Sequence, residues 1–220
     1  MDKVNPYPDG KTNTHVQKIN FLSEVITKHP QVAAYYYRRA KLYLALGKEN
    51  QAFPDIQKAV NLKPTQTEYL FALAQIYNLR NEPKNALIVA EKAENSGFKH
   101  EGLYRMLGKI YYQEGDFEKS KRNFERLEGL IPLDAEAFYF KGLLAAQKQD
   151  TSLMVLNLQK AIEQKYDYKE AYLELIHLYK NYGAFLKARE YNRIAIQNVG
   201  QGDAVLSFEY GEIMENIHKK

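Results

Sequence analysis

The sequence contains no cysteine among its 220 residues. This absence excludes disulfide bonds, thiolate catalysis and zinc sites built from cysteine. It does not separate a reducing compartment from an oxidising one, because a protein without cysteine has no thiol that either compartment would change. The cytoplasm and the periplasm therefore both remain open as locations.

An excess of charge of one sign is also missing. The chain has 31 basic and 27 acidic residues, and its formal net charge is only +4. Nucleic-acid binding depends on a strong positive field facing the phosphate backbone. We therefore expect no nucleic-acid partner.

Long apolar runs are absent as well. No stretch approaches the roughly 18 residues that a membrane-spanning helix needs, so we expect no membrane-spanning segment. Residues 1–13 contain Pro6, Pro8 and Gly10 and are expected to form a flexible polar leader. Such a leader is compatible with an export signal that has been removed, which would make the protein periplasmic or a lipoprotein.

Motifs of catalysis and cofactor binding are missing too. The chain has no glycine-rich phosphate loop, and no two histidines have the spacing that puts two metal ligands on one helix face. Glu170 and Glu174 stand one helical turn apart, but no nucleophile or buried base accompanies them, so we interpret them as part of a solvated face. The sequence predicts no enzyme, no metal site and no cofactor. The histidines are His15, His29, His100, His177 and His218.

What the sequence does contain is a strict period of 34 residues. Large residues, turn residues and small residues each recur at this interval without any insertion. Such a period indicates a repeat architecture made from one supersecondary unit. The large row is Tyr36, Leu70, Tyr104, Phe138 and Tyr172, the turn row is Gly47, Asn81, Gly115, Gln149 and Gly183, and the small row is Ala40, Ala74, Gly108 and Gly142.

Within one repeat the spacing of apolar residues is helical, as in Tyr36, Ala40 and Tyr43. Gly47 then provides the left-handed backbone conformation that ends a helix. A second apolar stripe starts at Ala52. Each repeat is therefore predicted to be a helical hairpin.

The pattern of one repeat resembles the tetratricopeptide-repeat (TPR) signature of a large residue, a small residue, Tyr, Gly, Ala, Ala and Pro. Five copies in phase cover residues 33–202, which makes the resemblance specific. It implies an all-α fold, a right-handed superhelical solenoid of antiparallel helix hairpins with about five repeats and a capping helix at each end. The residues that carry it are Tyr36, Ala40, Tyr43, Gly47, Ala52, Ala59 and Pro64, and again Leu107, Gly108, Tyr111, Gly115 and Pro132.

The register sets the expected boundaries. Thr14 and Gln17 have the spacing of a capping box and open the amino-terminal capping helix. A stripe that ends at Ile217 marks the carboxy-terminal one. The expected segments are a leader at 1–13, a capping helix at 14–30, repeats at 33–66, 67–100, 101–134, 135–168 and 169–202, and a capping helix at 203–220.

Two repeats depart from the pattern. In the fourth repeat Ala145 stands where the others have Tyr, and Met154 stands at a small position, which we interpret as an exchange of volume within the core. In the fifth repeat Ile176 replaces a small residue and Asn192 replaces an apolar one. We expect that hairpin to be splayed.

Arg39 occupies a position where TPR units usually place Leu, and Asp55 follows sixteen residues later on the second helix of the same hairpin. The two side chains are expected to form an ion pair across the hairpin, with a structural role.

The resemblance also implies a binding surface, because the first helix of every TPR unit lines a concave groove. The predicted groove residues are basic toward the first three repeats and acidic toward the last two, where Glu136 and Glu170 lie beside them. They are Tyr37, Arg38, Lys41, Phe71, Gln75, Arg105, Met106, Lys109, Tyr112, Tyr139, Phe140, Leu143 and Glu174.

Two interpretations of the aromatic groove residues stay open. The rings can pack against each other or against the amino-terminal segment, or they can be covered by a partner that docks as a helix or as an extended peptide. The groove lacks the Lys, Asn and Arg set with which some TPR domains grip the Glu-Glu-Val-Asp tail of heat-shock chaperones. We therefore expect no such clamp.

The predicted function is a non-catalytic scaffold that binds a peptide or helix of a partner protein in the groove. The alternative is a bacterial cell-envelope assembly or secretion accessory, exported or anchored by lipid. The sequence leaves the partner, the oligomeric state and the pathway open.

Overall fold

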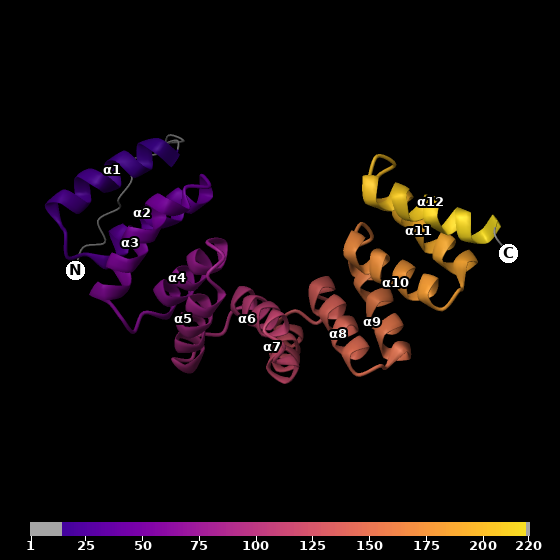
Figure 1. The fold of residues 1–220 in the computed structure, drawn as a ribbon. Coiled ribbons are helices and arrows are strands. Elements are labelled where there is room, and N and C mark those ends of the chain that lie inside the picture. The colour runs from indigo at the N-terminus through magenta and orange to yellow at the C-terminus, as the bar shows by residue number, and fades with distance from the viewer. Residues whose placement is uncertain (1–14, 219–220) are drawn as a thin grey trace. The chain divides into compact units, whose positions relative to one another are not determined.

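The computed structural model describes residues 15–218, which form twelve α-helices and no β-strand (Figure 1). This result confirms the all-α fold of helix hairpins with a further helix at each end. Thr14 and the leader at 1–13 lie outside the described residues. Within the described part, no helix is long and apolar enough to cross a membrane.

The chain divides into two compact units, and the boundary along the sequence falls between Ile110 and Tyr111. Unit one contains α1 (His15–Lys28), α2 (Ala33–Ala45), α3 (Glu49–Leu62), α4 (Thr67–Leu79), α5 (Pro83–Asn95) and most of α6 (Glu101–Gln113). Unit two contains the end of α6, then α7 (Phe117–Leu130), α8 (Ala135–Gln147), α9 (Thr151–Gln164), α10 (Lys169–Asn181), α11 (Phe185–Val199) and α12 (Ala204–His218).

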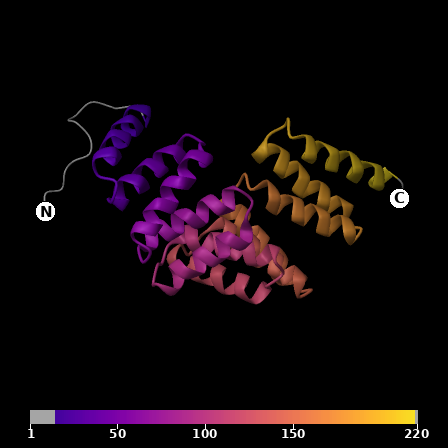
Figure 2. The same cartoon turned by 60° about the vertical axis from the view of Figure 1, so that its left-hand side comes forward.

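The helices keep the 34-residue register along the described chain. Neighbours in sequence pack against each other in both units, for example α2 with α3 and α10 with α11 (Figure 2). By the same register, α1 corresponds to the second helices of the hairpins and α12 to the first helices. The second helices begin at His15, Glu49, Pro83, Phe117, Thr151 and Phe185.

The turn inside every hairpin has a left-handed residue at the position that the sequence predicted. Gly47, Gly115 and Gly183 have φ angles of 64°, 79° and 67°, and Asn81 and Gln149 have φ angles of 59° and 57°. In each turn the next backbone N–H donates to a carbonyl of the first helix's last turn, as in a Schellman motif. The backbone thus reverses identically five times.

Small residues let the two helices of a hairpin approach closely. Ala40, Ala74 and Ala86 are almost completely buried. At Gly142 a Cβ atom would lie only 3.0 Å from Cγ of Leu158 on α9. A larger residue at Gly142 would require the Leu158 side chain to shift, so the small residue allows α8 and α9 to approach closely.

The predicted ion pair between Arg39 and Asp55 is confirmed. The Arg39 guanidinium donates to both carboxylate oxygens of Asp55, each at 2.6 Å, and also to Ser23 Oγ at 2.9 Å. These contacts connect α1, α2 and α3. A bidentate pair of this kind is one of the stronger polar contacts in proteins.

The fifth hairpin differs from its prediction. Ile176 and Asn192 are both fully buried, so α10 and α11 stay closely packed at these positions. The Asn192 side chain donates to the backbone carbonyl of Leu206 on α12 at 2.9 Å. The residues that were expected to splay the hairpin are thus accommodated inside it, because the Asn192 amide donates to the next helix, although its Oδ1 atom has no hydrogen-bond partner among the described residues.

The exchange of volume predicted in the fourth hairpin is incomplete. Met154 and Ala145 are buried in one cluster with Leu158. A hollow of about 260 Å³ nevertheless remains beside Ala145. Met154 does not line it, so the volume of the missing tyrosine ring is not fully replaced.

Gln149 provides a test of the turn geometry. A left-handed conformation costs a residue with a side chain about 1–2 kcal/mol, and glycine avoids most of that cost. Gln149→Gly should therefore stabilise the protein by about 0.5–1 kcal/mol after the entropy of glycine in the unfolded chain is subtracted. Chemical denaturation measures the change, and Gly115→Gln at the equivalent turn should shift stability in the opposite direction. Loss of stability in Gln149→Gly would contradict the turn assignment.

The Arg39–Asp55 pair can be replaced by the residues of the next hairpin, where Leu73 and Val89 occupy the same register. Asp55→Val alone should destabilise the protein by about 3 kcal/mol, because it leaves a half-buried guanidinium without its carboxylate. The double variant Arg39→Leu with Asp55→Val should fall within about 1 kcal/mol of the parent. Equal losses in the single and double variants, measured by urea unfolding, would show that the ion pair itself is required.

Candidate interaction surfaces

The groove residues of α2 form an exposed basic strip around one aromatic pair. Arg38 and Lys41 are exposed, and the half-buried Tyr37 ring packs on Tyr69 of α4 with 4.6 Å between ring centroids. Lys41 Nζ lies 5.7 Å from the centroid of the Tyr37 ring. Burial, followed by the charge of Glu68, raises the pKa of Tyr37, so its hydroxyl remains a neutral donor.

Two predicted anchors of unit one are not available at the surface. Phe71 is 7% exposed and Met106 is 8% exposed. The Phe71 ring packs against Phe98 at 5.4 Å and His100 at 5.1 Å, and a Cβ atom at Gly102 would lie 3.0 Å from it. These two residues therefore follow the first of the two interpretations, in which groove side chains pack within the chain, and they offer little surface to a partner. The remaining groove residues of unit one are Gln75, which is exposed, and Arg105 and Lys109, which are half-buried.

In unit two the groove residues form a continuous series of rings. Tyr112 contacts Phe140 at 5.4 Å, Phe140 contacts Tyr139 at 5.3 Å, and Tyr139 contacts Tyr168 at 5.1 Å. Phe140 also stacks on Phe124 of α7 at 4.6 Å. Tyr112, Tyr139, Phe140 and Leu143 are half-buried, so each keeps part of its surface accessible.

The sequence analysis missed the residues that pack against two of the predicted groove rings, one ring in each unit. His100 and Tyr168 hold equivalent places just before the first helix of a repeat. They pack against Phe71 and Tyr139, also equivalent, with the same centroid distance of 5.1 Å. The register could have revealed this pairing, because His100 and Tyr168 lie two whole repeats apart and so do Phe71 and Tyr139.

Glu174 introduces a charge beside the ring series of unit two. Its carboxylate is half-buried and has no hydrogen bond or ion pair with any residue that the structure describes. Burial raises the pKa of Glu174, and the charge of His177 opposes that shift. Burial also raises the pKa of Tyr139 above its ordinary range, assisted by the charges of Glu174 and Glu170. Glu174 therefore adds to this surface a negative charge that no cation of the described residues pairs directly.

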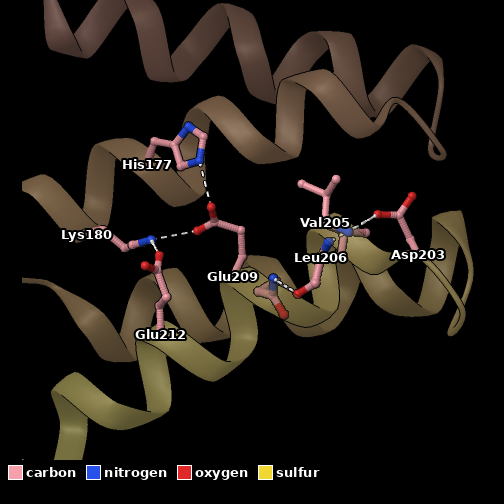
Figure 3. Close-up of polar contacts among 8 residues, drawn as sticks. His177, Lys180, Asp203, Val205, Leu206, Glu209 and Glu212 are labelled. Carbon is pink, nitrogen blue, oxygen red and sulfur yellow. Dashed lines mark hydrogen bonds and ion pairs between the residues drawn. The ribbon is translucent and has the colours of Figure 1, made fainter.

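His177, which lies next to this surface, takes part in a network that holds α12 (Figure 3). Glu209 accepts from Lys180 at 2.7 Å and lies 3.1 Å from His177 Nε2, while Lys180 also donates to Glu212 at 2.6 Å. Burial disfavours the charge on Glu209, but the hydrogen bonds from Lys180 and His177 outweigh it and lower its pKa. At the start of α12, Asp203 accepts from the Leu206 N–H at 3.1 Å.

A second hollow, of about 680 Å³, lies along α11 and α12 away from the predicted groove residues. Its lining combines Arg189, Arg193 and Glu190 with the partly exposed ring of Tyr210. In the described residues, no three His, Asp or Glu side chains are grouped as metal ligands.

Comparison with protein families agrees with this geometry. One tetratricopeptide-repeat model matches residues 33–66, and a second matches residues 105–152. The chain therefore carries tetratricopeptide repeats at these residues. A TPR fold supports a role as a protein-interaction scaffold.

Curated relatives share the repeats over part of their length. The human protein O-mannosyl-transferase TMTC1 is 26% identical over 166 residues, which cover 72% of this chain and 18% of that protein. The chicken DnaJ homolog subfamily C member 3 is 25% identical over 162 residues, which cover 67% of this chain and 32% of that protein. This TPR chain thus spans less than a third of the length of these relatives.

Solved TPR structures match nearly the whole fold. PilW, described as a widely conserved type IV pilus biogenesis factor, has a TM-score of 0.73 at 16% identity and covers 91% of this chain and 90% of its own. YrrB, described as a TPR protein with an unusual peptide-binding site, has a TM-score of 0.70 at 20% identity, with 87% and 97% covered. At these identities the similarity concerns the fold.

Glu174→Gln tests the unbalanced carboxylate. A carboxyl group with a raised pKa in the folded protein reduces stability as pH rises above its ordinary value of 4.5. The neutral amide should therefore increase stability at pH 7 by up to about 1 kcal/mol, and the increase should disappear below pH 4.5. Thermal unfolding at both pH values measures this. The exposed neighbour Glu170, changed to Gln, should show a smaller effect, and a destabilised Glu174→Gln would contradict the expectation.

Glu209→Gln tests the network on α12. Because the pKa of Glu209 is lowered in the folded protein, its charge contributes stability that is complete above its ordinary value of 4.5 and is lost as pH falls below it. The variant should lose about 1–2 kcal/mol at pH 7 and approach the parent in acid. Glu212→Gln, at a more exposed carboxylate, should lose less. A pH-independent loss in Glu209→Gln, measured by thermal unfolding, would assign the effect to packing instead.

Proposed function

We propose that this TPR chain is a non-catalytic scaffold that binds a segment of a partner protein on the groove residues of its first helices. Each unit contributes its own contact surface. The observation that carries the proposal is the half-buried ring series of unit two beside Glu174, whose charge has no direct partner in the described residues.

The surface of unit two fits a basic segment with apolar residues. The accessible parts of Tyr112, Tyr139 and Phe140 offer aromatic contacts, and Glu170 and Glu174 lie close enough to Tyr139 to influence its pKa. A lysine or arginine of a partner would gain an ion pair with Glu174 and a cation–π contact with the tyrosines. Retaining a costly carboxylate is typical of a functional site.

The surface of unit one fits acidic residues of a partner. Arg38 and Lys41 are exposed on α2, and Lys41 already lies near the Tyr37 ring. Charges at the rim of an interface mainly change the association rate and its dependence on salt. We therefore expect Tyr37 to contribute mainly to the affinity for the partner and Lys41 mainly to the association rate.

The proposal includes no catalytic step. One relative is named a mannosyl-transferase, but the chain matches 18% of it, and that activity is not carried over. We also propose no clamp for the Glu-Glu-Val-Asp chaperone tail, which is supported by the buried, uncharged Ala72 and Met106 at two of the required places.

Partner capture by crosslinking from the native cell, followed by binding measurements on the purified pair, tests the proposal. Glu174→Gln should weaken binding by at least fivefold while the fold stays intact. Lys41→Glu should lower the association rate and change its salt dependence. Glu91→Gln, on a second helix, serves as the matched control for the loss of one carboxylate.

Phe71 does not serve as a binding probe. Because it is buried, Phe71→Ala should destabilise unit one by about 3 kcal/mol. Parent-like affinity in both Glu174→Gln and Lys41→Glu would exclude the groove residues as the binding site. Recovery of a cell-envelope assembly component would favour the alternative role expected from the sequence.

A further inference from the structure

The hollow beside Ala145 lies within unit two, among α7, α8 and α9. None of its lining residues belongs to the predicted groove set. The lining has an apolar floor and a rim of lysines. It consists of Lys121, Lys141, Leu144, Ala145, Lys148, Leu153, Leu156, Asn157 and Lys160.

The next hairpin shows what is missing there. The Tyr179 ring stacks on Tyr191 with 5.5 Å between centroids and an interplanar angle of 10°, and Lys187 Nζ lies 4.6 Å from the Tyr179 ring. In the 34-residue register, these three residues correspond to Ala145, Asn157 and Leu153 of the fourth hairpin. All three corresponding residues line the hollow. The hollow is therefore the place of one aromatic ring, left open by Ala145.

The third hairpin supports the same comparison. Tyr111 occupies the position of Ala145, and Lys119 Nζ lies 4.9 Å from the Tyr111 ring. In both the third and the fifth hairpin, a tyrosine ring of the first helix thus lies beneath a lysine side chain of the second helix. An external ring placed in the hollow would meet surroundings that the fold already provides for an internal one.

The rim of the hollow is positively charged. Lys141 pairs with Glu128 at 3.0 Å and Lys148 pairs with Glu118 at 3.0 Å. The third lysine, Lys121, lies 3.6 Å from Glu125. These pairs are exposed or half-buried and hold the lysines weakly.

The fourth lysine, Lys160, has no carboxylate within ion-pair distance among the described residues, and its Nζ lies 5.5 Å from the Phe138 ring. No acidic residue lines the hollow itself. The rim therefore favours a ligand that carries negative charge around an apolar group.

The size of the hollow limits its occupant. Its volume of about 260 Å³ is below the roughly 300 Å³ at which sites for drug-sized ligands begin. One aromatic side chain fits this volume, whereas a helix or a cofactor does not.

We propose that the hollow beside Ala145 is a second binding site, which takes one aromatic side chain of an acidic segment of a partner protein. The ring would fill the place of the missing tyrosine, and carboxylates flanking it would contact Lys160 and Lys148. This site is separate from the groove residues and does not depend on the groove proposal.

Peptide titration of the full chain tests the site. The probe is the peptide acetyl-Glu-Asp-Phe-Glu-Asp-amide, followed by amide chemical shifts of the isotope-labelled protein. Saturable shifts should gather in α8 and α9 around Ala145, and binding should weaken as salt is raised. The same peptide with Ala in place of Phe should bind at least fivefold more weakly. Absence of shifts at millimolar peptide, or shifts gathered elsewhere, would overturn the proposal.

Filling the hollow from within is the sharpest variant. Ala145→Tyr restores the residue of the neighbouring hairpins and should abolish peptide binding without lowering the melting temperature. Ala146→Tyr adds the same ring one residue later, at the position of Tyr112 in the third hairpin, and should leave peptide binding unchanged. Unchanged binding in a folded Ala145→Tyr would overturn the proposal.

A charge variant keeps the test decisive if Ala145→Tyr does not fold. Leu156 is 47% exposed, so Leu156→Glu should be tolerated by the fold. It places a carboxylate at the hollow and should weaken the peptide at least fivefold by repulsion. Leu186→Glu, at an exposed leucine of α11, is the matched control and should bind like the parent. Equal affinity in Leu156→Glu and the parent would also contradict the proposal.

Discussion

The close approach of the two helices in each hairpin is the constraint on which the structure depends. A small residue at the contact in the first four hairpins and a left-handed residue at every turn allow this distance and this reversal, while the fifth hairpin has the buried Ile176 at the small position. At Gly142 the clearance is so small that a Cβ atom would lie 3.0 Å from Leu158. Because these features recur every 34 residues without insertion, each helix meets its neighbours in nearly the same way. The repeat thus fixes which positions face the core and which remain available for recognition.

That regularity also explains how the surface acquires its chemistry. A ring at the fifth place of a first helix packs against the residue that precedes the next first helix, as Phe71 does with His100 and Tyr139 does with Tyr168. Where the neighbouring side chains cover the ring completely, the ring becomes part of the core, and Phe71 is therefore not accessible to a partner. Where the cover is partial, the ring stays accessible. Glu174 lies beside such a ring, and burial disfavours its charge. Selection for stability alone would not favour a carboxylate at this position.

The period of 34 residues was enough to predict the helices, the five turns and the pairing of Arg39 with Asp55 across one hairpin. These features depend on residues that are close in sequence or related by the register. The burial of Phe71 and Met106 could not be predicted in this way, because it depends on side chains in other repeats. Asn192 was misjudged for the same reason, since its partner is a backbone carbonyl of α12. The hollow beside Ala145 was hidden because volume at one position was assumed to be replaced at another.

The most direct test of the central claim, that the first helices carry the recognition surface, is to map crosslinks between this TPR chain and its captured partner by mass spectrometry. We expect crosslinks of the lysines at the groove positions of α2 and α6, Lys41 and Lys109, and of Glu170 and Glu174 on α10 through carboxylate-reactive reagents. Crosslinks that fall only on α3, α5 and α11 would contradict the claim, provided that the four groove side chains form no crosslink and still react with small labelling reagents in the complex.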